Sequence, residues 1–220
     1  MPYGTVGVRK AIRNAARDPK VNRIVMTFYS SGGTVDGTGD LADEVRRASK
    51  QKPVTAYIED LCASAAYWVA SQADEVVSSP HAQIGSIGVY MIVNDESAAA
   101  EQAGIKTHVI STAELKGAGA PGAPITDAQL SEWQRQIDAI HKDFRKAVMS
   151  ARSMTQEEFD AVSTGGVWDA DTAKKLGLVD RVLSFSQLFG NSAKRLVVQV
   201  GKRGAAACLL YTSDAADEED

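Results

Sequence analysis

Cysteine, histidine and long apolar runs are scarce in this sequence, and their scarcity excludes several classes of protein. The two cysteines, Cys62 and Cys208, lie far apart and form no C-x-x-C motif. Neither a disulfide framework nor a zinc site is therefore predicted. No apolar run approaches the roughly 20 residues that a membrane-spanning helix requires. We expect no membrane span in the chain as given, no metal and no cofactor.

The charge of the chain says little about its partners. The formal net charge is −4, but residues 208–220 resemble the translation of a sequencing adapter, and we interpret them as an artefact tail. This tail holds five acidic and no basic residues. The rest of the chain has 24 basic and 23 acidic residues. The sequence has no basic patch, repeat or nucleic-acid-binding motif, and we expect no nucleic-acid partner.

Composition and pattern divide the chain into three parts. Residues 1–190 are predicted to form one domain, 191–207 a C-terminal extension and 208–220 the artefact tail. A chain of 220 residues that is 44% hydrophobic suffices for one sizeable core. A helical pattern over 8–16 follows the first residues almost directly, so we expect a truncated N-terminus that a membrane anchor could have preceded.

The most informative stretch is 60–68, where a serine stands among small residues between a strand and a helix. The sequence predicts a strand over 54–58 and a helix over 65–70. The free N–H groups of a helix start receive negative charge, and small neighbours let a substrate carbonyl approach the Ser64 hydroxyl. Ser64 is thus a candidate nucleophile, although a Ser-Ala-Ala run is also an ordinary helix start.

A glycine turn upstream supplies a second part of such a site. The apolar run over 23–29 predicts a strand buried on both faces, and a helical pattern covers 35–49. Between them lies the sequence Ser-Ser-Gly-Gly at 30–33. One N–H group of this turn, together with that of Ala65, would hold an oxyanion at the edge of the sheet. A turn that merely needs φ > 0 is the alternative interpretation.

Four ordered motifs resemble those of the S49 peptidases, a family that contains bacterial signal peptide peptidases and phage head-maturation proteases. They are Ser30-Ser31-Gly32-Gly33-Thr34-Val35, Ser64-Ala65-Ala66-Tyr67-Trp68, Ile84-Gly85-Ser86-Ile87-Gly88-Val89 and Gly177-Leu178-Val179-Asp180. The resemblance runs from about Val6 to Val182. It implies an α/β fold of the ClpP/crotonase-like type, a single-domain spiral of β-β-α units, and assembly into a homo-oligomer.

The resemblance also implies a catalytic Ser/Lys dyad that works without histidine. Carried over residue by residue, it makes Ser64 the nucleophile and Lys116 the general base. It makes Gly33 and Ala65 the oxyanion N–H donors, and Ser86 the hydroxyl that positions the lysine.

Two departures from the family pattern concern the oxyanion turn and the lysine. Ser31 stands where the family usually has a proline, which predicts a looser turn. Lys116 follows Thr-Ala-Glu-Leu at 112–115, where the family commonly has Ser-Gly-Ala-His or a similar sequence.

A lysine is a base only when it is neutral. Lowering a lysine pKa from about 10.4 by about three units costs roughly 4 kcal/mol, which burial must supply. We predict that Lys116 lies in a small-residue loop over 111–121, after a strand over 107–110, and that this loop folds over a cleft. An ion pair with Glu114 would keep the amine charged and prevent it from acting as a base.

The histidines and the remaining elements are expected to be structural. We place His81 in a turn, His108 in a strand and His141 in a long helix, none of them catalytic. The long helix begins at the capping signal of Thr126. Its apolar stripe consists of Leu130, Trp133, Ile137, Ile140, Phe144 and Val148. A strand at 167–168 and a short helix over 169–176 follow.

These observations predict a serine endopeptidase that acts on peptides or proteins. Phage scaffold or portal protein is favoured over cleaved signal peptides as substrate, which implies a cytoplasmic protein encoded by a phage or prophage. A catalytically inactive structural or scaffold-binding subunit of the same fold is one alternative. A dinucleotide binder is a weaker one, because Gly37 and Gly39 match G-x-G-x-x-A with Glu59 about twenty residues later, but Gly37 lies too far beyond the strand.

Overall fold

The structure is a computed structural model that describes residues 4–190. The predicted C-terminal extension and artefact tail both begin after residue 190 and lie outside the described residues. Residues 4–190 form two compact units, the first made of 4–88 with 143–190 and the second of 89–142.

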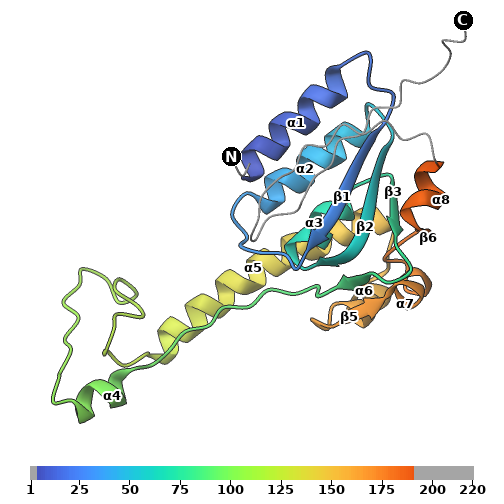
Figure 1. The fold of residues 1–220 in the computed structure, drawn as a ribbon. Coiled ribbons are helices and arrows are strands. Elements are labelled where there is room, and N and C mark those ends of the chain that lie inside the picture. The colour runs from blue at the N-terminus through green and yellow to red at the C-terminus, as the bar shows by residue number, and fades with distance from the viewer. Residues whose placement is uncertain (1–3, 191–220) are drawn as a thin grey trace, which may run out of the picture. The chain divides into compact units, whose positions relative to one another are not determined.

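A six-stranded sheet formed within residues 4–190 is the framework of the first unit (Figure 1). Its strands are β1 Ile24–Ser30, β2 Val54–Ala63, β3 Glu75–Ser78, β4 Gln83–Gly85, β5 Val167–Asp169 and β6 Arg181–Val182. β2 lies at the centre and pairs with β1 along one edge. Along its other edge, Thr55–Ile58 pair with β3 and Leu61–Ala63 pair with β4. β6 pairs with β3 in parallel, whereas β5 pairs with β4 antiparallel.

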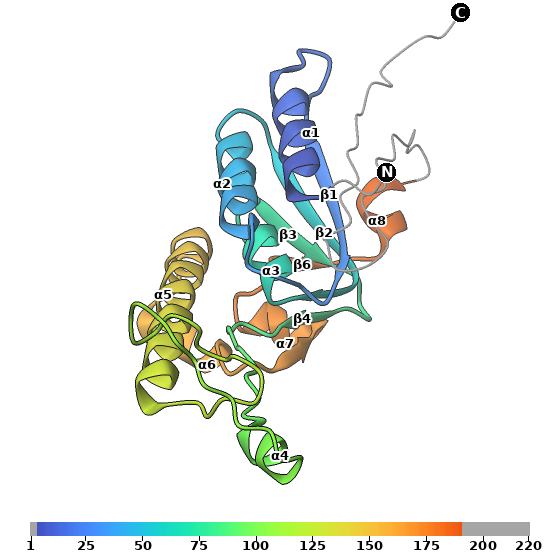
Figure 2. The ribbon, with the colours of Figure 1, turned by 90° about the vertical axis from the view of Figure 1, so that its left-hand side faces the viewer.

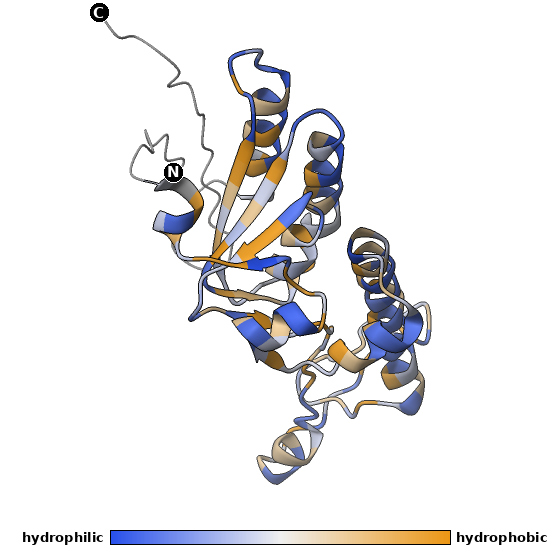
Figure 3. Cartoon of the chain, turned by 90° about the vertical axis from the view of Figure 1, so that its right-hand side faces the viewer, coloured by the Kyte–Doolittle hydropathy of each residue, from blue (hydrophilic) through white to orange (hydrophobic). Residues whose placement is uncertain are grey.

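Helices cover both faces of this sheet (Figures 1 and 2). α1 Thr5–Arg17, α2 Thr38–Ser49 and α3 Ala65–Ala70 lie on one face, and α8 Phe185–Phe189 lies on the other. Strands that are covered on both faces consist mainly of hydrophobic residues. Figure 3 shows that the central strands are hydrophobic over most of their length. This arrangement confirms the predicted α/β class and agrees with the ClpP/crotonase-like fold.

The two faces of β1 and β2 are filled by different side chains. On the α8 face, Val25, Tyr57 and Val77 form a buried cluster, and the rings of Tyr57 and Phe185 meet edge to face at 5.5 Å between their centroids. Ile24, Met26 and Phe28 alternate with Val25 along β1 and are also fully buried. The strand buried on both faces that the sequence predicts over 23–29 is confirmed as β1.

β2 is longer than its sequence pattern suggests. A strand was predicted over 54–58, but β2 continues to Ala63 and ends directly before Ser64. The extension exists because Leu61–Ala63 pair with Gln83–Gly85 of β4, a contact that the local pattern does not reveal. α3 begins at Ala65, as predicted, so the single residue Ser64 separates the long central strand from the helix.

Two buried aromatic residues of α3, Tyr67 and Trp68, hold this helix in place. Tyr67 donates its hydroxyl hydrogen to the carbonyl oxygen of Leu178 at 2.8 Å. The Trp68 ring stacks on Phe144 of α5 Asp127–Arg152, with 4.8 Å between the centroids and 6° between the planes. These contacts fix the helix whose first turn adjoins Ser64.

The acidic residue of the motif Gly177-Leu178-Val179-Asp180 forms an ion pair with a buried arginine. Arg152 binds both carboxylate oxygens of Asp180, at 2.7 and 2.9 Å, and also donates to the Gly177 carbonyl. The Val76 N–H of β3 donates to the same carboxylate at 2.7 Å. Burial raises the pKa of Asp180, but the hydrogen bonds from Arg152 and Val76 and the arginine charge bring it below its usual value. The motif thus ties α5 to the sheet.

The other helices of the first unit match the predictions closely. α1 covers the predicted helix over 8–16, whereas α2 begins at Thr38, three residues later than predicted, because Gly37 adopts φ 73° at its N-cap. α7 Ala170–Lys175 is capped by the Asp169 side chain, as the pattern over 169–176 predicts. α6 Gln156–Val162 begins with a capping box.

The second unit contains α4 Ser97–Gln102, the first part of α5 and irregular segments. The strand predicted over 107–110 is wrong: no strand forms there, and Ile110 is almost fully exposed. A β-branched run becomes a strand only when a neighbouring strand pairs with it, and none does here within the described residues. Residues 111–121 form a loop of successive turns, as predicted.

α5 is the long amphipathic helix that the sequence predicts. Thr126 and Gln129 exchange hydrogen bonds at its start, which confirms the capping signal. The stripe is buried only towards its C-terminal end, at Phe144 and Val148, whereas Leu130 is exposed. Across the described part of the chain, no helix combines the length and apolar character needed to cross a membrane.

Candidate active site

Ser64 occupies a strained backbone position between β2 and α3. Its φ is 53° and its ψ is −126°, a combination that residues with a Cβ rarely adopt. Its N–H donates to the Gly85 carbonyl at 2.8 Å, and its carbonyl accepts from the Trp68 N–H at 3.0 Å. Its hydroxyl does not cap α3. The surrounding structure therefore holds the serine in an unfavourable conformation without using its side chain for the helix.

Such a sharp strand-to-helix turn exposes the side chain at its tip. α/β-hydrolases hold their nucleophilic serine in a strained turn of this kind, even though their G-x-S-x-G sequence is absent here. Strain that persists at one residue indicates that the fold has been kept for a reason other than stability. The role of Ser64 as nucleophile stays a prediction, with which this turn is compatible.

The glycine turn after β1 lies directly against Ser64. Gly32 has φ 102°, and a Cβ built on it would stand 2.8 Å from both the Ser64 Cβ and the Ala63 carbonyl oxygen. The same Cβ would stand 3.1 Å from the Ala65 nitrogen. Only glycine permits this approach, so the two sequence motifs predicted to share a site are in contact.

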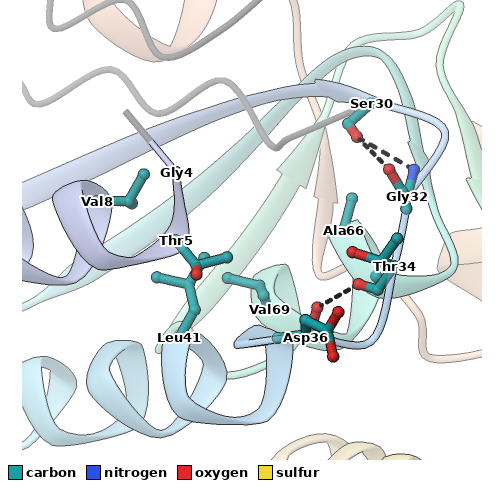
Figure 4. A pocket seen from close by; sticks show the side chains of 13 residues that line it. Gly4, Thr5, Val8, Ser30, Gly32, Thr34, Asp36, Leu41, Ala66 and Val69 are labelled. Carbon is teal, nitrogen blue, oxygen red and sulfur yellow. Dashed lines mark hydrogen bonds between the residues drawn. The ribbon is translucent and has the colours of Figure 1, made fainter. Parts of the chain in front are cut away.

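The two predicted oxyanion donors line one pocket of about 290 Å³. Figure 4 shows this pocket from close by. Gly33 and Ala65 contribute to its wall, and neither of their N–H groups donates a hydrogen bond within residues 4–190. Ala65 is the first residue of α3, where an N–H has no acceptor inside the helix. Two free amides beside a candidate nucleophile are the arrangement that stabilises an oxyanion.

The opposite wall of this pocket is mainly apolar. Val8 of α1, Leu41 of α2 and Val69 of α3 line it, together with the hydroxyl-bearing Thr5, whereas Thr34 lies on the side of the glycine turn. Three helices that pack on one face of the sheet thus enclose a space next to the strand ends, the position at which α/β sheets bind ligands.

Adding a methyl group at Gly32 should damage this site. We expect Gly32→Ala to be less stable than the wild type by about 2–4 kcal/mol, because a positive φ is unfavourable for alanine and the Cβ overlaps Ser64. Gly165→Ala is the matched control, because Gly165 also has a positive φ, 77°, but has open space around it. Urea unfolding of both variants measures the difference, and equal losses would contradict the packing described here.

Ser86 lies beside Ser64 at the end of the neighbouring strand. In the parallel pair of β2 and β4, Ala63 is in register with Gly85, so the next residue of each strand is a serine. Ser86 also has a positive φ, 50°, and its N–H donates to the Gly166 carbonyl at 2.6 Å. The structure thus brings together Ser64, Gly33, Ala65 and Ser86 in the first unit.

Lys116 lies in the second unit, in the loop of small residues over 111–121. Its side chain is exposed there, and its backbone N–H donates to Ala113 at 3.0 Å. Glu114 is also exposed, and no ion pair joins it to Lys116 within residues 4–190. The pairing of Ser64 with Lys116 as a dyad stays a prediction.

The histidines and Cys62 are the other residues whose chemistry could suggest a functional role. His81 lies in a turn and His141 in α5, as predicted, whereas His108 lies in an irregular segment and not in a strand. Burial raises the pKa of the Cys62 thiol, which makes it a poor nucleophile. In the range that the structure covers, no cluster of three or more His, Cys, Asp or Glu side chains could hold a metal.

Comparison with known proteins identifies the family. The sequence profile of Peptidase family S49 matches residues 46–199, which is most of the chain. The chain belongs to peptidase family S49. The S49 match includes three of the four motifs, with Ser64, Ser86 and Lys116, whereas the motif at 30–35 lies before it. It confirms the resemblance to this family.

Three of the relatives come from a bacterium and two phages. Protease 4 of Salmonella typhi is 32% identical over 184 residues, which cover 83% of this chain and 30% of that protein. Capsid assembly protease C of Escherichia phage lambda is 30% identical over 181 residues, 82% of this chain and 41% of that protein. A head-tail preconnector protein of Enterobacteria phage P21 is 27% identical, with 99% of this chain and 43% of that protein covered. The chain therefore spans less than half the length of each of these three relatives.

Sequence reasoning missed one side chain in this S49 site. The Ser30 hydroxyl accepts a hydrogen bond from the Gly32 N–H at 3.1 Å and donates one to the Gly32 carbonyl at 3.4 Å. A serine two residues before a glycine at a strand end is the signal for such a turn.

The glycines of the dinucleotide-binding alternative have a structural explanation. Gly37 forms the left-handed N-cap of α2 and packs against Thr5.

Proposed function

We propose that this chain is a serine endopeptidase that uses a Ser/Lys dyad. Ser64 is the nucleophile, Lys116 the general base, and the N–H groups of Gly33 and Ala65 stabilise the oxyanion. Ser86, next to Ser64 in register, is the hydroxyl that positions the lysine amine.

One observation carries the proposal: the strained turn at Ser64 lies against two free backbone amides. A serine that only began a helix would have no reason to be held at φ 53° with its hydroxyl unused by the helix. The amides of Gly33 and Ala65 line a pocket beside it. Membership of a peptidase family supports peptide bonds as the substrate.

The proposed reaction balances with these groups and one water molecule. The Ser64 oxygen attacks the peptide carbonyl carbon while its proton moves to the neutral amine of Lys116. The carbonyl oxygen becomes an oxyanion held by the two N–H groups. The carbon–nitrogen bond then breaks, and the protonated lysine gives its proton to the leaving amine. Water, activated by the same lysine, hydrolyses the remaining ester and restores the Ser64 hydroxyl.

We further propose protein substrates of the kind that occur in phage head assembly. Two relatives carry names that refer to capsid assembly and to the head-tail preconnector, which favours scaffold or portal protein over signal peptides. This proposal includes a cytoplasmic location during virion assembly and a homo-oligomeric enzyme. The apolar wall of the pocket, formed by Val8, Leu41 and Val69, would receive an aliphatic substrate side chain.

Covalent labelling combined with proteolysis tests the function. The purified chain is treated with a fluorophosphonate probe, digested and analysed by mass spectrometry, while a second sample is incubated with casein. We expect the probe on Ser64 and cleavage of casein that the probe inhibits. Labelling of another serine would refute the nucleophile assignment. Absence of both labelling and cleavage would favour the catalytically inactive structural subunit.

A further inference from the structure

Ser30 is a buried polar residue of this site to which the chemistry above gives no role. It is the last residue of β1, and only 9% of its surface is exposed. Its hydroxyl oxygen accepts the Gly32 N–H at 3.1 Å, and its hydroxyl hydrogen points to the Gly32 carbonyl oxygen at 3.4 Å. Figure 4 shows both hydrogen bonds between the Ser30 side chain and the Gly32 backbone. One side chain therefore holds both polar groups of Gly32.

Ser30 itself is fixed to the strand that leads to Ser64. In the pairing of β1 with β2 it is opposite Cys62, beyond an irregularity that follows Phe28. Cys62 precedes Ser64 by two residues and is fully buried. The Ser30 hydroxyl therefore has a defined position relative to the candidate nucleophile.

The link from Ser30 to catalysis is the peptide bond between Gly32 and Gly33. A peptide group is planar and trans, so its C=O and its N–H point in opposite directions as one rigid unit. A hydrogen bond that holds the Gly32 carbonyl consequently sets the direction of the Gly33 N–H. That N–H is free of protein acceptors within residues 4–190, and Gly33 lines the pocket together with Ala65.

The two glycines leave the orientation of the Gly32–Gly33 peptide free unless another group restrains it. Without a Cβ, the chain at Gly32 and Gly33 has access to backbone conformations that other residues avoid, and the peptide between them could rotate. The residue before Gly32 is Ser31, which leaves φ free where a proline would fix it. The Ser30 hydroxyl supplies the restraint from the side chain.

We propose that Ser30 is a positioning residue that aims the Gly33 N–H at the oxyanion by holding the Gly32 peptide. This inference rests on the proposed peptidase function and deepens it. It predicts that loss of the hydroxyl weakens the transition state far more than it weakens substrate binding, because the oxyanion exists only after attack has begun.

The test compares four variants of the full chain on a peptide substrate, with kcat and KM measured separately. Ser30→Ala is expected to lower kcat by about 10- to 100-fold, less than the loss of a whole oxyanion donor, and to change KM by less than about threefold. Ser30→Thr keeps a hydroxyl and should recover kcat to within about fivefold of the wild type. Ser31→Ala is the neighbouring exposed control and should be unaffected. Ser30→Cys has only a weak donor and acceptor and should fall between alanine and threonine.

A peptide aldehyde inhibitor supplies the second measurement. It forms a hemiacetal with the serine and needs the oxyanion donors, so its affinity should fall in Ser30→Ala in parallel with kcat/KM. An unchanged kcat in Ser30→Ala, or a loss confined to KM, would overturn the inference. If Ser30→Ala does not fold, an unchanged kcat in folded Ser30→Cys overturns it equally. A wild-type chain that is inactive and unlabelled at Ser64 would refute the proposed function instead.

Discussion

Replacing Ser64 with alanine should abolish peptide cleavage and leave the fold intact. Removal of a serine nucleophile lowers kcat by about 10⁴-fold or more, with residual catalysis from the oxyanion donors alone. The hydroxyl does not cap α3, so we expect the free energy of unfolding to change by less than about 1 kcal/mol. Casein or peptide cleavage by the purified variant, together with its urea unfolding curve, measures both effects.

A second serine provides the control for this substitution. Ser153 also has a positive φ, 54°, but lies between the helices α5 and α6 and not between a strand and a helix. Ser153→Ala should therefore keep full activity. Wild-type cleavage by Ser64→Ala would show that another group attacks the substrate.

The strain at Ser64 also leads to a prediction about the stability of a glycine variant. Glycine adopts φ 53° and ψ −126° more readily than any residue with a Cβ. Ser64→Gly should thus be inactive but more stable than Ser64→Ala by about 1–2 kcal/mol, although glycine normally destabilises a chain. A Ser64→Gly variant that is less stable than Ser64→Ala would show that the turn is not strained.

Local sequence patterns were sufficient for the parts of the site that are formed by neighbours in the chain. The strand over 23–29 and the helix over 65–70 follow from apolar runs and small residues, and both were predicted to within one or two residues. The position of Ser64 between strand and helix follows from the same patterns. The proximity of Gly33 and Ala65 followed from the rule that strand ends meet at one edge of a sheet.

The remaining features depend on partners that are distant in the sequence. β2 reaches Ser64 only because Leu61–Ala63 pair with β4, and the same pairing sets Ser86 beside Ser64. The run over 107–110 has strand-forming residues but no neighbouring strand, so its prediction failed. Arg152 gave no signal in the sequence, because its partner Asp180 lies 28 residues further along the chain. Pairing and ion-pair formation of this kind cannot be inferred from one sequence by periodicity.

Ser64 belongs to the first unit, and the proposed general base Lys116 belongs to the second. Lys116→Arg should be as inactive as Lys116→Ala. A guanidinium keeps its proton at every working pH and cannot accept one from the serine hydroxyl. Lys116 is exposed and contacts its loop through the backbone, so both variants should retain the stability of the wild type to within about 0.5 kcal/mol.

Lys106→Arg is the matched control, because Lys106 is an exposed lysine of the same unit. It should leave kcat/KM unchanged. The wild-type rate should rise with pH through the neutral and alkaline range, because only the unprotonated amine acts as a base. A histidine base would instead produce a limb near pH 6.5. Retained activity in Lys116→Arg, or a pH profile that changes when His81, His108 or His141 is replaced, would assign the base to another residue.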